Sequence, residues 1–335
     1  NSSGDLLASL PQDRRETVRR LGRHGFRAVI STAPDWAAEF HALYHEPTVR
    51  RRHGLEGYVM PAHEIARTVQ SGTTSAARVV EASLARIAAR NGVLGAFTDV
   101  VADRALARAA AVDAQIRSGA RLPLAGVPFA VKNLFDLEGE VTVAGSRIGR
   151  ERPPATADAF LVRQLRAAGA VCLGALNMDE YAYGFTTENA HDGPCHNPHD
   201  LSRSAGGSSG GCGASVAGGL VPLSLGSDTN GSIRVPASLC GIFGLKPTYG
   251  RLGRSGTYPF VASLDHLGPF ARDVADLAAA WDALQGSDQG DPAQGEWPVE
   301  PAGPVLAQGV DGLRIAVADD HFARNGRPEA FSAVA

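Results

Sequence analysis

Apolar residues recur at helical spacing early in the chain. Val80, Leu84 and Ile87 lie on one face of a helix predicted over 75–90. The Asn91-Gly92 pair that follows is typical of a C-terminal stop. This pattern predicts an amphipathic helix that ends near residue 91.

Short apolar runs separated by helical stretches predict buried strands. The runs cover 96–101, 126–132 and 170–174. An alanine-rich helix that ends at Gly119 separates the first two, and a helix carrying Phe160 precedes the third. Such alternation predicts an α/β fold with a central mixed, largely parallel β-sheet covered by α-helices on both faces.

The first 59 residues differ from the rest in pattern and composition. Arginines crowd a predicted helix there, which is typical of a solvated basic face. We therefore expect an Arg-rich helical segment over 1–59, of unassigned role and not necessarily native to the domain, and one domain over 60–335. Because the chain does not begin with Met and ends at Ala335 within a segment whose pattern is still that of a folded domain, beyond a predicted strand at 313–318, we also expect this domain to be truncated at its C-terminus.

The composition is that of a globular protein without a polyanionic partner. The chain is 44 % hydrophobic and carries a formal net charge of -3, so the basic excess that nucleic acid or anionic membranes require is missing. No apolar run approaches the roughly 18 residues of a membrane span. Its 4 cysteines lack the spacing of a disulfide framework or a zinc site. We expect a cytoplasmic protein that binds neither membrane nor nucleic acid.

The first candidate for chemistry is Lys132, at the end of an apolar strand. Removal from water disfavours the ammonium form, so the pKa of such a lysine falls toward the range of a general base. A lysine whose stem follows apolar surface while its amine reaches water would show the same pattern. Lys132 alone therefore leaves both interpretations open.

The second candidate is the loop Ser204–Gly211, in which glycine pairs bracket Ser208 and Ser209. Its composition also fits a flexible linker. The loop matches the GxSxG nucleophile elbow, but an elbow needs an apolar strand just before its serine. Residues 191–203 are polar and contain two prolines, and no convincing Asp and His follow in order. The elbow interpretation is disfavoured.

The third candidate is the segment Gly226–Ser238, which follows an apolar run. Small residues before Ser232 leave several backbone N–H groups free to converge, as an oxyanion hole requires. Asp228 and Arg234 can pair across this turn and stiffen it. Taken alone, the segment fits a phosphate-binding nest equally well.

Together the three segments resemble the amidase signature family over about 60–322. The family's lysine motif matches 131–136, its GGSSGG loop matches Gly206–Gly211, and its serine signature matches 226–237. A typical member has glycine at the position of Asn230, so we expect substrate selection to differ here. The resemblance implies the amidase-signature fold and an amidohydrolase that cleaves the C–N bond of a small amide without metal or organic cofactor.

The resemblance also implies a role for each site residue. Ser232 would be the nucleophile, Ser208 the proton relay and Lys132 the base. The oxyanion would be held by the N–H groups of Thr229, Asn230, Gly231 and Ser232. Structural support would come from Asp228, Arg234, Gly206 and Gly207.

Two rival sites have weaker patterns. His191–His199 holds three histidines and one cysteine, but their spacing matches no common zinc site, so a surface loop is favoured. Cys212 follows the glycine-rich loop without a convincing histidine partner, so packing is favoured over a thiol nucleophile.

Within the family, 227–241 and 183–189 are most similar to the branch that hydrolyses carboxybiuret and related ureido compounds. One alternative is the glutaminase subunit of a tRNA-dependent amidotransferase, which shares the neighbourhood Met178–Glu180. An alternative of another class is a catalytically inactive binding or assembly protein. The expected partner is a small-molecule amide, and a homodimer or a small partner subunit remains open.

Overall fold

The computed structural model describes residues 60–308 and residue 312. The predictions for residues 1–59 and for the strand at 313–318 lie outside the described residues. The compact unit to which the elements of this fold belong begins at Pro61.

A six-stranded sheet forms the centre of this unit, with strand order β1-β3-β2-β8-β10-β9. Strand β3 pairs in parallel with β2, and β2 pairs in parallel with β8, whereas β1, β10 and β9 add antiparallel. The predicted mixed α/β architecture is confirmed, with the parallel pairs at the centre of the sheet. The strands are β1 (Phe97–Val100), β2 (Pro128–Lys132), β3 (Val171–Leu176), β8 (Leu223–Asp228), β9 (Phe243–Gly244) and β10 (His266–Ala271).

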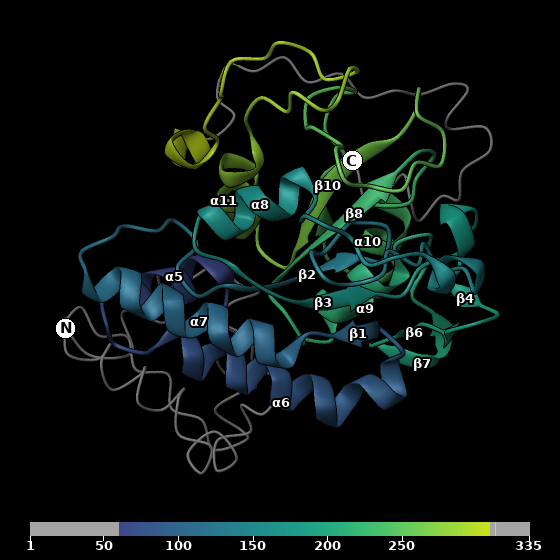
Figure 1. The fold of residues 1–335 in the computed structure, drawn as a ribbon, viewed down its shortest axis with the longest axis horizontal. Coiled ribbons are helices and arrows are strands. Elements are labelled where there is room, and N and C mark those ends of the chain that lie inside the picture. The colour runs from purple at the N-terminus through teal and green to yellow at the C-terminus, as the bar shows by residue number, and fades with distance from the viewer. Residues whose placement is uncertain (1–59, 309–311, 313–335) are drawn as a thin grey trace, which may run out of the picture. The chain divides into compact units, whose positions relative to one another are not determined.

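Helices pack around this sheet. Helices α8 and α11 contact each other, as do α9 and α10, and the two pairs lie on opposite sides of the sheet (Figure 1). Helices α6 and α7 pack together and contact β3. The helices are α5 (Ala62–Gln70), α6 (Ala76–Leu94), α7 (Ala102–Arg117), α8 (Phe160–Ala167), α9 (Gly210–Ala217), α10 (Arg234–Leu239) and α11 (Val274–Leu284).

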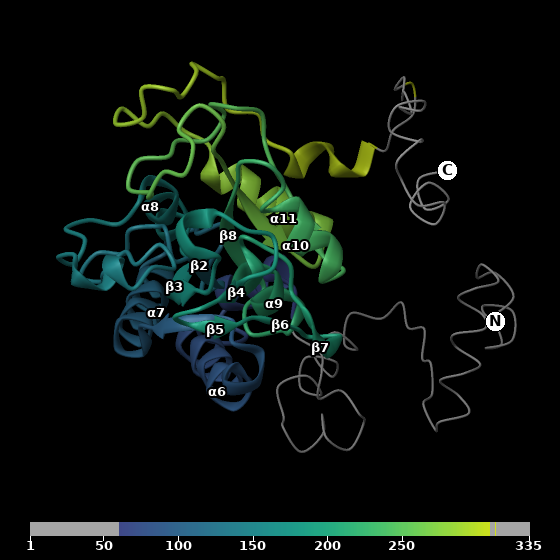
Figure 2. The ribbon, with the colours of Figure 1, turned by 90° about the vertical axis from the view of Figure 1, so that its right-hand side faces the viewer.

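Shorter elements complete the fold. Two small hairpins, β4–β5 and β6–β7, lie near α9 (Figure 2). They and the 3-10 turns are β4 (Glu188–Asn189), β5 (Gly193–Pro194), β6 (His196–Asn197), β7 (Asp200–Ser204), η1 (Ile148–Glu151), η2 (Glu180–Ala182) and η3 (Gly303–Gln308).

The end of α6 differs from its prediction. The helix runs through Asn91 to Leu94, and Gly95 takes the left-handed cap with φ 61°. The side chain of Asn91 accepts from Phe97 N at 2.7 Å and donates to Phe97 O at 2.9 Å. Asn91 therefore ties the helix end to β1, and Gly95 is the stop. A Cβ on Gly95 would also lie 2.4 Å from Pro194 O.

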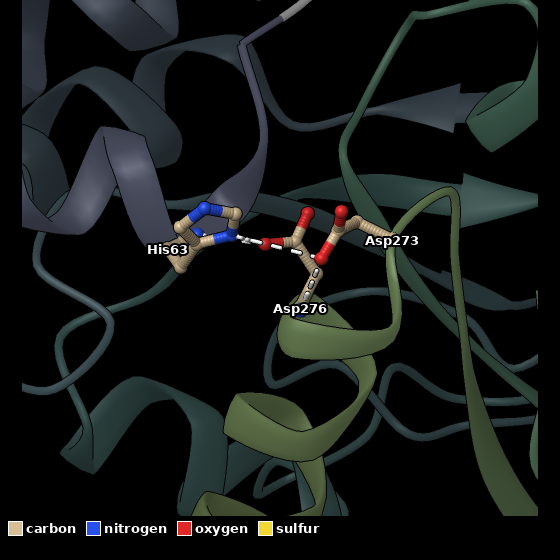
Figure 3. A group of neighbouring side chains, drawn as sticks. All are labelled: His63, Asp273 and Asp276. Carbon is tan, nitrogen blue, oxygen red and sulfur yellow. Dashed lines mark hydrogen bonds and ion pairs between the residues drawn. The ribbon is translucent and has the colours of Figure 1, made fainter. Parts of the chain in front are cut away.

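Asp276 of α11 fastens α5 to the rest of the unit (Figure 3). Its carboxylate accepts the N–H groups of Ala62 at 2.7 Å and His63 at 2.8 Å, which caps the N-terminus of α5. Asp273 caps its own helix by accepting from Ala275 N at 2.7 Å. These carboxylates therefore serve as helix caps.

The central strands β2 and β8 end in polar residues at the same edge of the sheet. All of β2 and all of β8 are buried. Because β2 and β8 are parallel, their C-terminal residues, Lys132 and Asp228, reach the same edge. Among the described residues no helix combines the length and the apolar character needed to cross a bilayer.

Candidate active site

Lys132 ends β2 with its side chain fully buried, at 0 % exposure. Its Nζ donates to Ser208 Oγ at 2.7 Å and to Ser227 Oγ at 2.9 Å. The alternative in which the amine reaches water is therefore wrong. The amine of Lys132 is buried between the hydroxyls of Ser208 and Ser227.

Burial also changes the acidity of this amine. It lowers the pKa of Lys132 to about 8, and Cys212 and the carboxylates of Asp179, Asp265 and Asp228 raise it by less. Lys132 is therefore poised to exchange a proton near neutral pH.

Ser208 lies in a loop whose backbone requires glycine. The Gly207–Ser208 peptide bond is cis, and Gly206 has φ 83°. A Cβ on Gly206 would lie 2.9 Å from Pro236 Cα, and one on Gly207 would lie 2.1 Å from Asp179 Oδ2. The glycines thus let this loop press against its neighbours while Ser208 meets Lys132.

The neighbouring Ser209 has a different partner. Its Oγ donates to Ser227 O at 3.1 Å, which fastens the start of α9 to the end of β8. Of the two serines in the loop, Ser208 is the one bonded to the lysine. The strand that precedes this loop, β7, is largely exposed, unlike the buried strand of a nucleophile elbow.

Asp228 organises the turn that follows β8. Its fully buried carboxylate accepts from Arg234 Nη2 at 2.9 Å and Nε at 3.0 Å, from Gly231 N at 2.7 Å and from Ile233 N at 3.1 Å. Burial raises the pKa of Asp228, but these donors together outweigh burial and hold it below its ordinary value. An ionised carboxylate therefore fixes the turn from within.

Ser232 sits on this turn with 5 % of its surface exposed. The N–H of Gly231 donates to the carboxylate of Asp228, so, unlike the other three expected donors, it is not free to bind an oxyanion. In the part of the chain that the structure describes, the N–H groups of Thr229, Asn230 and Ser232 meet no protein acceptor. Within the same residues, no hydrogen bond joins Ser232 Oγ to Ser208 Oγ.

A cavity of about 140 Å³ adjoins the lysine's second partner, Ser227. Tyr258, Phe260 and Asp265 also line it. The carboxylate of Asp265 accepts from Thr229 Oγ1 at 2.5 Å and from Phe260 N at 2.8 Å. Asp265 therefore links the turn before Ser232 to the loop that walls the cavity.

Sequence reasoning did not single out three polar residues of this site. They are Asp179, Ser227 and Asp265, each at most 8 % exposed. Ser227 directly precedes Asp228 at the end of β8, and that position could have revealed it. The contacts of Asp179 and Asp265 join segments that are distant in the sequence. A local sequence pattern therefore does not predict that these two residues belong to the site.

The rival sites have structural roles. His199 Nε2 bonds to Cys240 O at 2.9 Å, and His191 Nε2 bonds to Glu180 Oε1 at 3.2 Å. Cys212 is buried, and burial raises the pKa of its thiol to about 12, which removes it as a thiolate nucleophile at neutral pH.

One group of metal-ligand type occurs among the described residues. His63, Asp273 and Asp276 bring ligand atoms within 4.8 Å of one another. Both oxygens of Asp276 already accept hydrogen bonds, from Ala62, from the backbone of His63 and from its ring (Figure 3). Helix capping accounts for this group.

Fold and site together define an α/β protein with a buried lysine–serine pair of the amidase type. The Amidase family matches residues 78–335, and the chain belongs to this family. It is 60 % identical over 276 residues to AtzE, a component of the 1-carboxybiuret hydrolase of Pseudomonas sp. (strain ADP), and the match covers 82 % of this chain and 60 % of that protein. It is 50 % identical to one component of the glutamyl-tRNA(Gln) amidotransferase of Anaeromyxobacter dehalogenans (strain 2CP-C), over 77 % of this chain and 54 % of that protein.

Solved structures show the same fold. One, described as "An unexpected vestigial protein complex reveals the evolutionary origins of an s-triazine catabolic enzyme", matches with TM-score 0.81 and 60 % identity over 82 % of this chain and 60 % of that one. A bacterial aryl acylamidase of the amidase signature family matches with TM-score 0.71 and 35 % identity over 76 % of this chain and 53 % of that one. The amidase-signature fold is thereby confirmed, and the chain spans between half and two thirds of the length of these relatives.

Proposed function

We propose that the protein is an amidohydrolase that cleaves the C–N bond of a small amide or ureido compound through an acyl-enzyme on Ser232. The observation that carries the proposal is the fully buried Lys132, whose Nζ lies 2.7 Å from Ser208 Oγ. A buried amine with a pKa of about 8 and a hydroxyl partner is suited to withdraw a proton from a serine.

In the proposed mechanism the neutral amine of Lys132 accepts the proton of Ser208 Oγ. Ser208 in turn takes the proton of Ser232 Oγ as that oxygen attacks the amide carbonyl. This step requires the two serine oxygens to come within hydrogen-bond reach, and catalytic contacts of this kind often tighten only when substrate binds. The proton then returns through Ser208 to the leaving amine, and water cleaves the acyl-enzyme.

Oxyanion stabilisation follows from the turn built on Asp228. The N–H groups of Thr229, Asn230 and Ser232 are the proposed donors, because each lacks a protein acceptor among the described residues. Gly231 completes the turn through its bond to Asp228. We assign Asp228, Arg234, Gly206 and Gly207 to the support of this geometry. One good donor contributes about 3 kcal/mol to the transition state.

The proposed substrate class is a small ureido compound resembling carboxybiuret. Similarity to a component of a 1-carboxybiuret hydrolase supports this choice. We assign residues 60–335 to one amidase domain and residues 1–59 to a separate segment, to which we assign no function. No metal or organic cofactor takes part in these proposed steps.

A second candidate function is the glutaminase subunit of a tRNA-dependent amidotransferase. Identity of 50 % to a component of such an enzyme favours it as the main alternative. A catalytically inactive binding or assembly protein is the alternative of another class. The presence of Lys132, Ser208 and Ser232 together disfavours it.

We further propose a small partner subunit rather than a homodimer, because a structural neighbour at 60 % identity is described as a protein complex. The proposed compartment is the cytoplasm, since all four cysteines lie in the described residues as free thiols.

Ammonia release tests the substrate. Purified protein would be incubated with biuret-like ureido compounds, glutamine and aliphatic amides, beside Ser232→Ala as the control. We expect the highest kcat/KM with a ureido compound and no turnover by the variant. Glutamine as the preferred substrate would support the glutaminase, and absence of turnover with all three classes would support the non-catalytic alternative.

A further inference from the structure

Asp179 is a buried carboxylate that reaches into the catalytic loop without belonging to the motif of that loop. It precedes the turn η2 and is 8 % exposed. Its backbone N–H donates to the carbonyl oxygen of Ser208 at 3.3 Å. Its carboxylate accepts from Thr187 N, with both oxygens at 3.0 Å. One residue thus joins the serine loop to the segment that ends at Thr187.

Two glycines show how closely the carboxylate approaches the surrounding backbone. A Cβ on Gly207 would lie 2.1 Å from Asp179 Oδ2, and a Cβ on Gly184 would lie 2.5 Å from Oδ1. A side chain at either position would displace the carboxylate. The carboxylate is therefore clamped between the backbone next to Ser208 and the backbone of the 183–187 segment.

This carboxylate differs in charge balance from Asp228, another acid that acts on Lys132, whereas Asp265 resembles it in forming no ion pair among the described residues. Asp228 is neutralised by Arg234, and Asp265 accepts one hydroxyl and two backbone N–H groups. Among the described residues, Asp179 forms no ion pair within 4.0 Å. Its charge therefore acts on the buried lysine without a neighbouring cation to offset it.

The mutual effect of the two groups agrees with this placement. Burial raises the pKa of Asp179, while the bond from Thr187 N and the charge of Lys132 lower it by less. Asp179 in turn is one of the groups that raise the pKa of Lys132, together with Asp228, Asp265 and Cys212. The Cys212 thiol, with a pKa of about 12, is uncharged across the neutral range.

We propose that Asp179 is a positioning residue for the reaction proposed above: its carboxylate anchors the backbone beside Ser208 and supplies a negative charge, not offset by an ion pair, that acts on Lys132. This inference rests on the proposed function, because it concerns the proton transfer between Lys132 and Ser208. The residue itself need not touch the substrate.

The pH profile of Asp179→Asn tests the inference in the full chain. The amide keeps the size of the side chain and one acceptor for Thr187 N, but it removes the charge. Without that charge Lys132 loses its proton more readily, so the acid limb of kcat/KM moves to lower pH, by on the order of one pH unit. A residue with a purely structural role would lower kcat/KM without moving the limb.

Asp158→Asn is the matched control. Asp158 is also a buried carboxylate that accepts a backbone N–H, from Glu138 at 2.9 Å, but unlike Asp179 it pairs with an arginine, Arg166, and it is not one of the groups named as acting on Lys132. We expect the acid limb of kcat/KM in Asp158→Asn to stay at the pH of the wild-type limb. If Asp179→Asn fails to fold, Asp179→Ser, which is also uncharged, must show the same shift.

The outcomes separate the inference from the proposed function. A wild-type limb near pH 8 that neither Asp179 variant moves would overturn the role of Asp179 and leave the lysine base intact. A wild-type profile without a limb near pH 8 would instead contradict Lys132 as the base.

Discussion

Lys132 Nζ lies 2.7 Å from Ser208 Oγ, in a place where the lysine has no contact with solvent. The pair joins the end of β2 to the glycine-rich loop before α9, which is bonded to the end of β8. Burying a charged amine costs free energy of desolvation, which an ion pair can offset. A buried amine without such a pair therefore suggests that its proton takes part in chemistry.

The first prediction concerns pH. With a pKa of about 8, Lys132 is mostly protonated below pH 8 and mostly neutral above it. Because the neutral amine is the proposed base, kcat/KM should rise with pH through a single limb centred near pH 8. A rate that falls through this range would contradict a basic role for the lysine.

The second prediction concerns removal of the base. Lys132→Met should lower kcat/KM by on the order of 10²–10⁴-fold, the usual contribution of a general base. The chain contains one other lysine, Lys246, whose Nζ donates to the carbonyl oxygen of Pro247. Lys246→Met is therefore a matched control and should keep kcat/KM near the wild-type value. Equal losses in both variants would indicate a general effect on folding.

The third prediction concerns the glycine beside the relay serine. Gly207→Ala places a Cβ 2.1 Å from Asp179 Oδ2, so it should displace the loop and greatly lower kcat/KM. Gly92→Ala serves as the control, because no atom lies within 4 Å of its Cβ and α6 continues through it. That change should leave activity intact and stabilise the protein by about 0.5–1 kcal/mol. Thermal unfolding and initial rates measure both effects.

The fourth prediction concerns the ion pair under the nucleophile turn. Arg234→Ala removes two donors from the buried carboxylate of Asp228, although three backbone N–H groups remain. We expect a loss of about 1–3 kcal/mol in the free energy of unfolding, with a larger relative loss of kcat than of substrate affinity. Urea unfolding and steady-state kinetics would measure this, and an unchanged kcat would contradict the supporting role.

The same carboxylate sets a dependence of stability on pH. The pKa of Asp228 is lower in the folded protein than its unfolded value of about 3.9. Its ionised form therefore stabilises the fold above that unfolded pKa, and the contribution is lost as pH falls through the folded pKa. The stability difference between wild type and Asp228→Asn should be constant near neutral pH and shrink below about pH 4.

Much of the fold and part of the site could be predicted from the sequence. The helix over 75–90 and the strand that ends at Lys132 followed from apolar spacing, because burial selects those positions directly. The end of α6 did not, because Asn91 bonds to Phe97 in the next element rather than ending the helix.

The same limit applies to the site. Lys132 and Ser208 were identified through the motifs of the amidase signature family, and the structure brings the two residues together. Asp179 carries no such signal, because its contacts with Thr187 and Gly207 arise only when separate segments pack together. The engagement of Gly231 by Asp228 was missed for a related reason: small residues reveal backbone freedom but not which acceptor a given N–H will find.

The central claim is that Ser232 is the nucleophile activated through Ser208 and Lys132. Its most direct test is treatment of the purified protein with a fluorophosphonate probe, followed by mass mapping of the labelled residue. We predict one label on Ser232, lost in Ser232→Ala and formed far more slowly in Ser208→Ala and Lys132→Met. A label on Ser208 or Ser209, or labelling that persists in Ser232→Ala, would contradict the account.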